Sequence, residues 1–225
     1  MEEIIDYIEK NVFPFYEKQI GKLYADHARR VAAKSLDILK QIDDKSIKPE
    51  IVYTAAAYHD MGLVNGKPLH EKLGAQMFLE DTEIKKFFTP EEIKIIAEAI
   101  EDHRASNNDE PRSVYGRIVS TADRLGWLDV DEAFKVWHAN RLKNMPDASL
   151  DEMIEDTRLH VLKKYSTGGY VDGKLYFPDP KNEFEMFRKE VTGLAENPKK
   201  FKERYLNVYA NVVSATGVEP AKTGF

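Results

Sequence analysis

Apolar residues recur at the spacing of an α-helix along nearly the whole chain. In residues 23–42 they form one continuous stripe, and charged residues occupy the opposite face. Pro14 is expected to interrupt the first helix near its end. Comparable stripes predict helices over residues 3–10, 70–79, 89–104, 114–128, 131–144, 149–165, 181–196 and 198–214.

One further segment is apolar nearly all round and is predicted to form the central, most buried helix. Residues 48–50 start it with proline in the first turn, and residues 51–57 continue it. His59 and Asp60 follow at its C-terminal end, and Gly62 comes directly after them. Two adjacent side chains that can bind metal are an unusual end for an apolar helix.

Near residues 168–177 the helical pattern gives way to two short β-prone runs. Asp172 and Gly173 stand between the runs, and this pair favours a hairpin turn because both turn positions adopt positive φ. Residues 64–69 and 105–112 are predicted loops. The whole pattern predicts an all-α protein with one small β-hairpin.

Composition excludes several classes of protein. The 225 residues include no cysteine, which removes disulfide scaffolds, thiolate zinc sites, iron–sulfur clusters and cysteine nucleophiles. The net charge of −6 argues against stable nucleic-acid binding. No apolar run approaches the length of about 20 residues that spans a bilayer, and the acidic N-terminus is unlike a signal peptide. We therefore expect a cytoplasmic protein without a membrane partner.

Four of the six histidines lie at helix ends or beside apolar stripes, together with two aspartates. The six candidate metal ligands are His27, His59, Asp60, His70, His103 and Asp123. Imidazole and carboxylate are suited to zinc, iron, manganese and related divalent ions. Adjacent residues on a helix do not face each other, so His59 and Asp60 need further ligands from other helices. The helices that carry His27 and Asp123 can supply them.

The order of these residues resembles the HD-domain superfamily of metal-dependent phosphohydrolases. Three segments carry the resemblance: Asp-His-Ala-Arg-Arg-Val-Ala at 26–32, Tyr-His-Asp-Met-Gly-Leu at 58–63 and Ser-Thr-Ala-Asp-Arg-Leu at 120–125. It covers about residues 20–130 and implies an HD-domain helical bundle. In such a bundle the implied metal ligands are His27, His59, Asp60 and Asp123.

HD proteins with two metals carry additional histidines before the final aspartate, and the resemblance assigns that role to His70 and His103. Asp60 would then bridge both ions and act as the catalytic residue. The implied cofactor is one or two divalent ions, from among Fe, Mn, Zn, Mg, Co and Ni. Such ions polarise a phosphoryl oxygen and lower the pKa of a bridging water. The implied reaction is therefore attack of a metal-activated hydroxide on a phosphomonoester or phosphodiester.

The implied substrate is a small phosphorylated metabolite or nucleotide. Four basic residues near the motifs are candidates for binding it: Lys67, Lys72, Arg104 and Arg124. Leu63 stands where many phosphodiesterase members have lysine, and the Glu-Asp pair of ppGpp hydrolases is missing. These departures leave the substrate open.

We expect residues 1–225 to form a single compact domain. Residues 20–130 would be the HD metal-binding core, and residues 131–225 would form a helical extension that packs on it and holds the substrate determinants. A homodimer is possible. Two other functions stay open: a di-iron HD-type oxygenase that cleaves a C–C or C–P bond with the same six ligands, and a non-catalytic HD signalling module.

Overall fold

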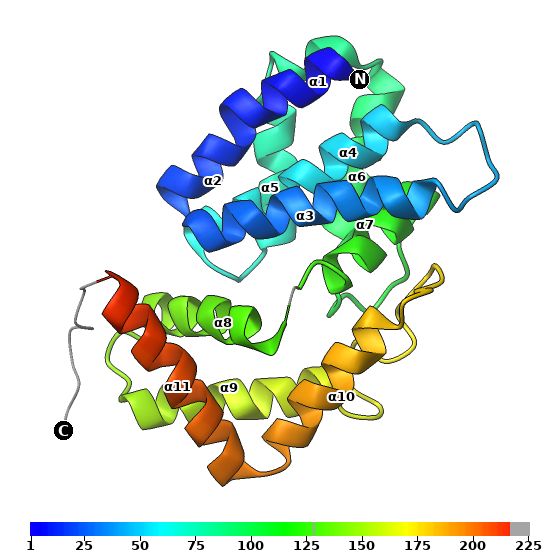
Figure 1. Ribbon diagram of the computed structural model, residues 1–225. Helices are drawn as coiled ribbons and strands as arrows, with labels where there is room; N and C mark the ends of the chain where they lie inside the picture. Colours follow the sequence, from blue (N-terminus) through cyan, green and yellow to red (C-terminus); the bar gives the residue numbers. More distant parts are fainter. Residues whose placement is uncertain (128, 217–225) are drawn as a thin grey trace. The chain divides into compact units, whose positions relative to one another are not determined.

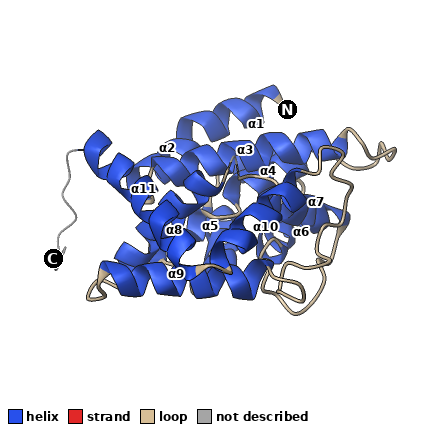
Figure 2. Cartoon of the chain, turned by 60° about the horizontal axis from the view of Figure 1, so that its bottom comes forward, coloured by secondary structure: helices blue, strands red, loops and turns tan. Residues whose placement is uncertain are grey.

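The computed structural model describes residues 1–127 and 129–216, with side chains described as far as Ala210 apart from residue 128. All regular secondary structure in this part of the chain is helical (Figures 1 and 2), which confirms the predicted all-α fold. The chain divides into two compact units. The first holds residues 1–126 and 174–178, and the second holds residues 127–173 and the chain from residue 179 onward. The predicted packing of the extension on the core stays a prediction.

The first unit is a bundle arranged around its most apolar helix. Its elements are α1 (Glu2–Tyr7), a π-helical turn (Ile8–Val12), α2 (Phe13–Gln19), α3 (Lys22–Leu39), α4 (Pro49–Tyr58), a 3-10 turn (Met61–Asn65), α5 (His70–Glu80), a second 3-10 turn (Ile84–Phe87), α6 (Pro90–Asp102) and α7 (Val114–Arg124). Every residue of α4 from Ile51 to Tyr58 is buried, and α4 packs against α3, α6 and α7. The predicted central helix is therefore confirmed.

Two boundaries in this unit differ from the predictions. Pro14 does not end the first helix, because the chain stays helical to Gln19. Proline lacks an amide hydrogen, and here it lies in the first turn of α2, directly after the π-helical turn that breaks the regular i→i−4 pattern. Helix α7 ends at Arg124, and the predicted end at residue 128 lies outside the described residues.

The second unit contains α8 (Val130–Asn144), α9 (Leu150–Tyr165), α10 (Glu183–Ala195) and α11 (Pro198–Thr216), close to the predicted ranges. Its core is aromatic: the ring of Phe134 lies 4.9 Å from that of Phe201 and 5.3 Å from that of Tyr205, between centroids. Ser149 caps α9 and forms a reciprocal capping box with Glu152. None of the described helices is both long and apolar enough to cross a membrane.

The hairpin predicted near residues 168–177 is wrong, since the described chain forms turns and no strand there. The amide of Val171 donates to the carbonyl of Lys164 at the end of α9 (3.3 Å), so it does not pair with a facing strand. The Asp172 carboxylate accepts a hydrogen bond from the amide of Gly168 (2.8 Å) and closes a local turn. The second β-prone run belongs to the first unit instead.

Candidate metal centre

Five helices of the first unit bring the six candidate ligands together. His27 lies near the start of α3, His70 begins α5, and Asp123 lies in the last turn of α7. His59 and His103 directly follow the ends of α4 and α6, and Asp60 follows His59. Side chains at the ends of several helices can converge on one point. The middle parts of the same helices can then still pack against one another.

Asp60 is the point that the other ligands share. Its Oδ2 lies 3.4 Å from Nε2 of His59, whereas its Oδ1 lies 3.3 Å from Nε2 of His70 and 3.5 Å from Nε2 of His103. Two groups of three therefore form, each with ligand atoms within 4.8 Å of one another. The first group is His27, His59 and Asp60, and the second group is Asp60, His70 and His103.

Asp123 joins the first group. Its Oδ1 lies 3.1 Å from Nε2 of His27 and 3.9 Å from Nε2 of His59. The Asp123 carboxylate thus lies beside His27 of α3 and His59 after α4. These two partners explain why an aspartate interrupts the apolar stripe of α7. The Asp123 side chain is half-buried, and pairing with histidines offsets the cost of removing a carboxylate from water.

Three of the histidines are oriented by backbone carbonyls three residues earlier. Nδ1 of His59, His70 and His103 lies 2.7, 2.9 and 2.6 Å from the carbonyl oxygens of Ala56, Lys67 and Ile100. A carbonyl only accepts, so each Nδ1 donates its hydrogen and the neutral ring keeps a lone pair on Nε2. Nε2 of His59 is buried and has no hydrogen-bond partner. In the neutral ring this lone pair can bind a metal ion, which would displace the proton that His59 carries at pH 7.

The close approach of Asp60 and His70 depends on glycine. A Cβ at Gly62 would lie 2.0 Å from the carbonyl oxygen of His70 and 2.7 Å from the amide nitrogen of Gly74. Backbone atoms cannot yield at such distances as a flexible side chain can. Gly62 therefore lets the turn after Asp60 rest directly on the start of α5.

Tyr16 fixes the end of α4, and nothing in the sequence pattern pointed to it. Its hydroxyl donates to the carbonyl of Ala57 (3.1 Å) and accepts from the amide of Asp60 (3.1 Å). The side chain is fully buried. One hydroxyl therefore binds a carbonyl and an amide at the C-terminal end of α4, where backbone groups lack partners within the helix. These two bonds hold the His-Asp pair in place.

The charges of the cluster support one another. Burial alone would lower the pKa of His59, but the carboxylates of Asp60 and Asp123 outweigh burial and raise that pKa to about 9. Burial likewise works against ionised Asp60, yet the neighbouring histidines hold the pKa of Asp60 well below its usual value. The carboxylates are therefore ionised at neutral pH and present negative charge to a cation.

Glu71 is a buried carboxylate beside the cluster that the sequence analysis missed. It is 5 % exposed, and its Oε2 lies 2.9 Å from Nη1 of Arg104 and 3.3 Å from Nδ1 of His70. A glutamate after a histidine carries no periodic or motif signal of its own. Its position ties one candidate ligand to one candidate substrate-binding residue.

The four basic residues occupy different positions. Arg104 is half-buried and bound to Glu71. Lys67 is half-buried, and its carbonyl holds His70. Lys72 is exposed on α5, whereas Arg124 is buried and donates to Ser120 within its own helix.

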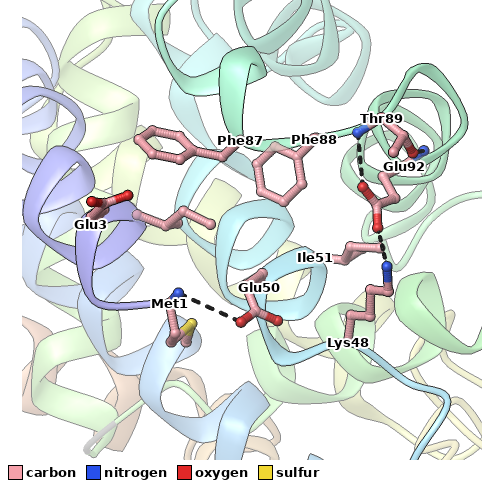
Figure 3. Close-up of a pocket in the computed structure, with 10 residues that line it drawn as sticks. Met1, Glu3, Lys48, Glu50, Ile51, Phe87, Phe88, Thr89 and Glu92 are labelled. Atoms are coloured by element: carbon pink, nitrogen blue, oxygen red, sulfur yellow. Dashed lines mark hydrogen bonds and ion pairs between the residues drawn. The ribbon is translucent and has the colours of Figure 1, made fainter.

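A separate hollow of about 500 Å³ lies among the N-terminal ends of α1, α4 and α6 (Figure 3). Phe87 and Phe88 line it together with Ile51, and Lys48 forms an ion pair with Glu92 at its edge. The candidate metal ligands His59 and Asp60 follow the opposite, C-terminal end of α4. The hollow is therefore distinct from the metal centre.

Comparison with known proteins agrees with this geometry. Residues 24–128 match the sequence model of the HD domain, so this segment belongs to the HD-domain superfamily, and the predicted resemblance is confirmed. HD domains bind divalent metal ions, and the family includes metal-dependent phosphohydrolases. Searches of curated proteins and of solved structures gave no match.

Proposed function

We propose that this protein is a metal-dependent phosphohydrolase that acts on a small phosphorylated metabolite or nucleotide, as a monoesterase or a diesterase. The observation that carries the proposal is the position of Asp60, whose two oxygens face two separate groups of histidines. One carboxylate between two sets of ligands is suited to holding a pair of ions a few ångströms apart.

The donor set fits a divalent transition metal. Four imidazoles and two carboxylates suit Fe, Mn, Zn, Co or Ni better than calcium, which prefers oxygen ligands alone. His27, His59 and Asp123 would hold one ion, His70 and His103 would hold the other, and Asp60 would contact both. When bound, such a pair supplies polarisation of a phosphoryl oxygen and a lowered pKa of a nearby water.

The protein's own groups would prepare the site for an anionic substrate. Asp60 stays ionised because its histidine neighbours lower its pKa, so it can hold the cluster together at neutral pH. Arg104, fixed by Glu71, is the best supported of the four candidates for binding a phosphate group, because its guanidinium is anchored beside His70. Lys67, Lys72 and Arg124 remain proposals of the same kind.

The proposal is tested by reconstituting metal-depleted protein with single ions. The protein would be assayed with p-nitrophenyl phosphate, bis(p-nitrophenyl) phosphate, nucleotides, sugar phosphates and phosphonates, with and without dioxygen. We expect phosphate release that needs the metal, stops with a chelator and continues without dioxygen. Turnover of a phosphonate that needs both iron and dioxygen would support the oxygenase instead. Metal binding without any turnover would support the signalling module.

Other expectations accompany this function and stay predictions. They are a cytoplasmic location, a possible homodimer and the lack of a nucleic-acid partner. Residues 131–225 are also expected to hold the substrate determinants.

A further inference from the structure

A short segment from the second half of the chain belongs to the first unit. Residues Lys174–Pro178, which we call the strap, group with residues 1–126, although the chain on either side of the strap groups with the second unit. Nζ of Lys174 donates to the carbonyls of Ala105 and Asn107, both at 2.8 Å. The amide of Tyr176 donates to Oγ1 of Thr121 (3.1 Å).

The strap binds residues that lie close in sequence to two of the candidate metal ligands. Ala105 and Asn107 follow His103 closely in the chain, and Thr121 precedes Asp123 by two residues in α7. The oxygen atoms that accept hydrogen bonds from the strap therefore belong to the loop after His103 and to α7, which carries Asp123.

The two carbonyls held by Lys174 flank Ser106, and Ser106 is a partner of Arg104. Oγ of Ser106 accepts a hydrogen bond from Nε of Arg104 (2.9 Å). The amide of Asn107 also donates to the carbonyl of Arg104 (3.1 Å), so residues 104–107 form a turn. Lys174 thus closes a turn in which the Ser106 hydroxyl binds the Arg104 guanidinium, while Glu71 holds the same guanidinium from α5.

The partners of Lys174 are two backbone carbonyls of one turn. Among the described residues its ammonium is bound by neutral carbonyl oxygens and not by a carboxylate. Burial lowers the pKa of Lys174, and the charge of Arg124 lowers it further. A lysine that served only solubility would keep its ammonium in water, as Lys181 does with its side chain 80 % exposed.

We propose that Lys174 is a positioning residue: by holding the carbonyls of Ala105 and Asn107, it fixes the turn that directs Arg104 to the substrate phosphate. The proposal rests on the proposed function, and it assigns the second half of the chain a direct part in completing the site. His103, the candidate ligand just before this turn, is held without Lys174: its Nδ1 binds the Ile100 carbonyl, and the Ser120 hydroxyl donates to the His103 carbonyl (3.1 Å).

The first test is amide hydrogen exchange of the full-length protein. Lys174→Met keeps the aliphatic chain and removes the donors, Lys174→Arg restores donors, and Lys181→Met is the matched surface control. We expect exchange of residues 104–108 to accelerate at least about tenfold in Lys174→Met, because both charged hydrogen bonds of the ammonium, to Ala105 and to Asn107, are lost. Lys174→Arg should recover most of the protection, and Lys181→Met should match the wild type.

The second test is steady-state kinetics with the best substrate of the phosphoester panel. Lys174→Met should raise KM about tenfold and change kcat by less than about twofold, because binding and not chemistry is weakened. Metal content and melting temperature should stay at the wild-type values. In an Arg104→Ala background the same substitution should have little further effect, since both changes act on one contact.

Two results would overturn the proposal. One is wild-type exchange at residues 104–108 together with an unchanged KM in Lys174→Met. The other is a general loss of metal, melting temperature and kcat that Lys174→Arg does not rescue, which would mean a purely structural role. If the wild-type protein hydrolyses none of the panel, the proposed function fails, and the exchange experiment alone decides whether Lys174 fixes the turn.

Discussion

Nε2 of His70 lies 3.3 Å from Oδ1 of Asp60, although the two side chains come from separate elements of the bundle. Asp60 follows α4, and His70 opens α5 after Leu69, which adopts the left-handed backbone conformation (φ 57°). Such a conformation costs a non-glycine residue of the order of 1 kcal/mol or more. The chain accepts this strain where it turns His70 toward Asp60.

Substitution of Gly62 tests whether this approach depends on backbone contact. Gly62→Ala should lower the free energy of unfolding by about 3 kcal/mol and reduce metal content, because the added Cβ would lie 2.0 Å from the His70 carbonyl oxygen. Urea unfolding and metal analysis measure both effects.

Gly193→Ala in α10 is the matched control for Gly62→Ala. A Cβ there meets no atom within 4 Å, so the same substitution should stabilise the helix by up to about 1 kcal/mol. Wild-type stability and metal content in Gly62→Ala would contradict the close packing of the turn on α5.

The buried carboxylate of Glu71 should matter for the neighbouring cluster although it is not a candidate ligand. Glu71→Gln keeps the size of the side chain and removes the charge that faces Arg104 and Nδ1 of His70. We expect metal affinity to fall about tenfold, as is common when a partner of a metal-binding histidine is lost. Glu91→Gln, on an exposed position of α6, is the control. Equal affinities in both variants would exclude a role for Glu71.

Metal binding should depend on pH in a defined direction. The pKa of His59 in the metal-free protein is about 9, so its imidazole carries a proton at pH 7 that a metal ion must displace. Metal affinity should therefore rise between about pH 7 and pH 9. Titration calorimetry at pH 7 in two buffers of different ionisation enthalpy would measure the released protons. An affinity that does not change over this range would contradict the prediction.

The same pKa has the opposite consequence for the metal-free protein. Because the pKa of folded His59 is raised above its unfolded value of about 6.5, protonation stabilises the fold below that pH. This contribution should be lost as the pH rises toward about 9. Thermal melts of metal-free and metal-loaded protein across this range should therefore diverge.

The helices and the candidate ligands could be predicted from the sequence because both leave local patterns. An apolar stripe marks each amphipathic helix, and His59, Asp60 and Asp123 stand out because ionisable residues interrupt apolar segments. To predict that these ligands converge, the order of the motifs along the chain was needed as well. Spacing within one helix cannot show which other helices lie beside it.

The contacts that support the site left no such pattern. Tyr16 binds Asp60, which is far away in the sequence. Glu71 binds Arg104 from a helix position that any polar residue could fill. The Asp172-Gly173 pair does form a turn, but turn chemistry alone does not say what the following residues bind. Lys174 turned out to hold the loop after His103 instead of a strand, and this long-range partner could not be foreseen.

The central claim is that Asp60 joins two metal sites, and the most direct test is the metal content of Asp60→Ala. Purified wild-type protein, Asp60→Ala and the exposed control Asp37→Ala would be loaded with the activating ion, desalted and analysed by elemental analysis and circular dichroism. We predict about two ions per chain in the wild type and the control, as a two-metal site requires, and almost none in Asp60→Ala with its helical signal kept. Wild-type metal content and phosphate release in Asp60→Ala would contradict the account.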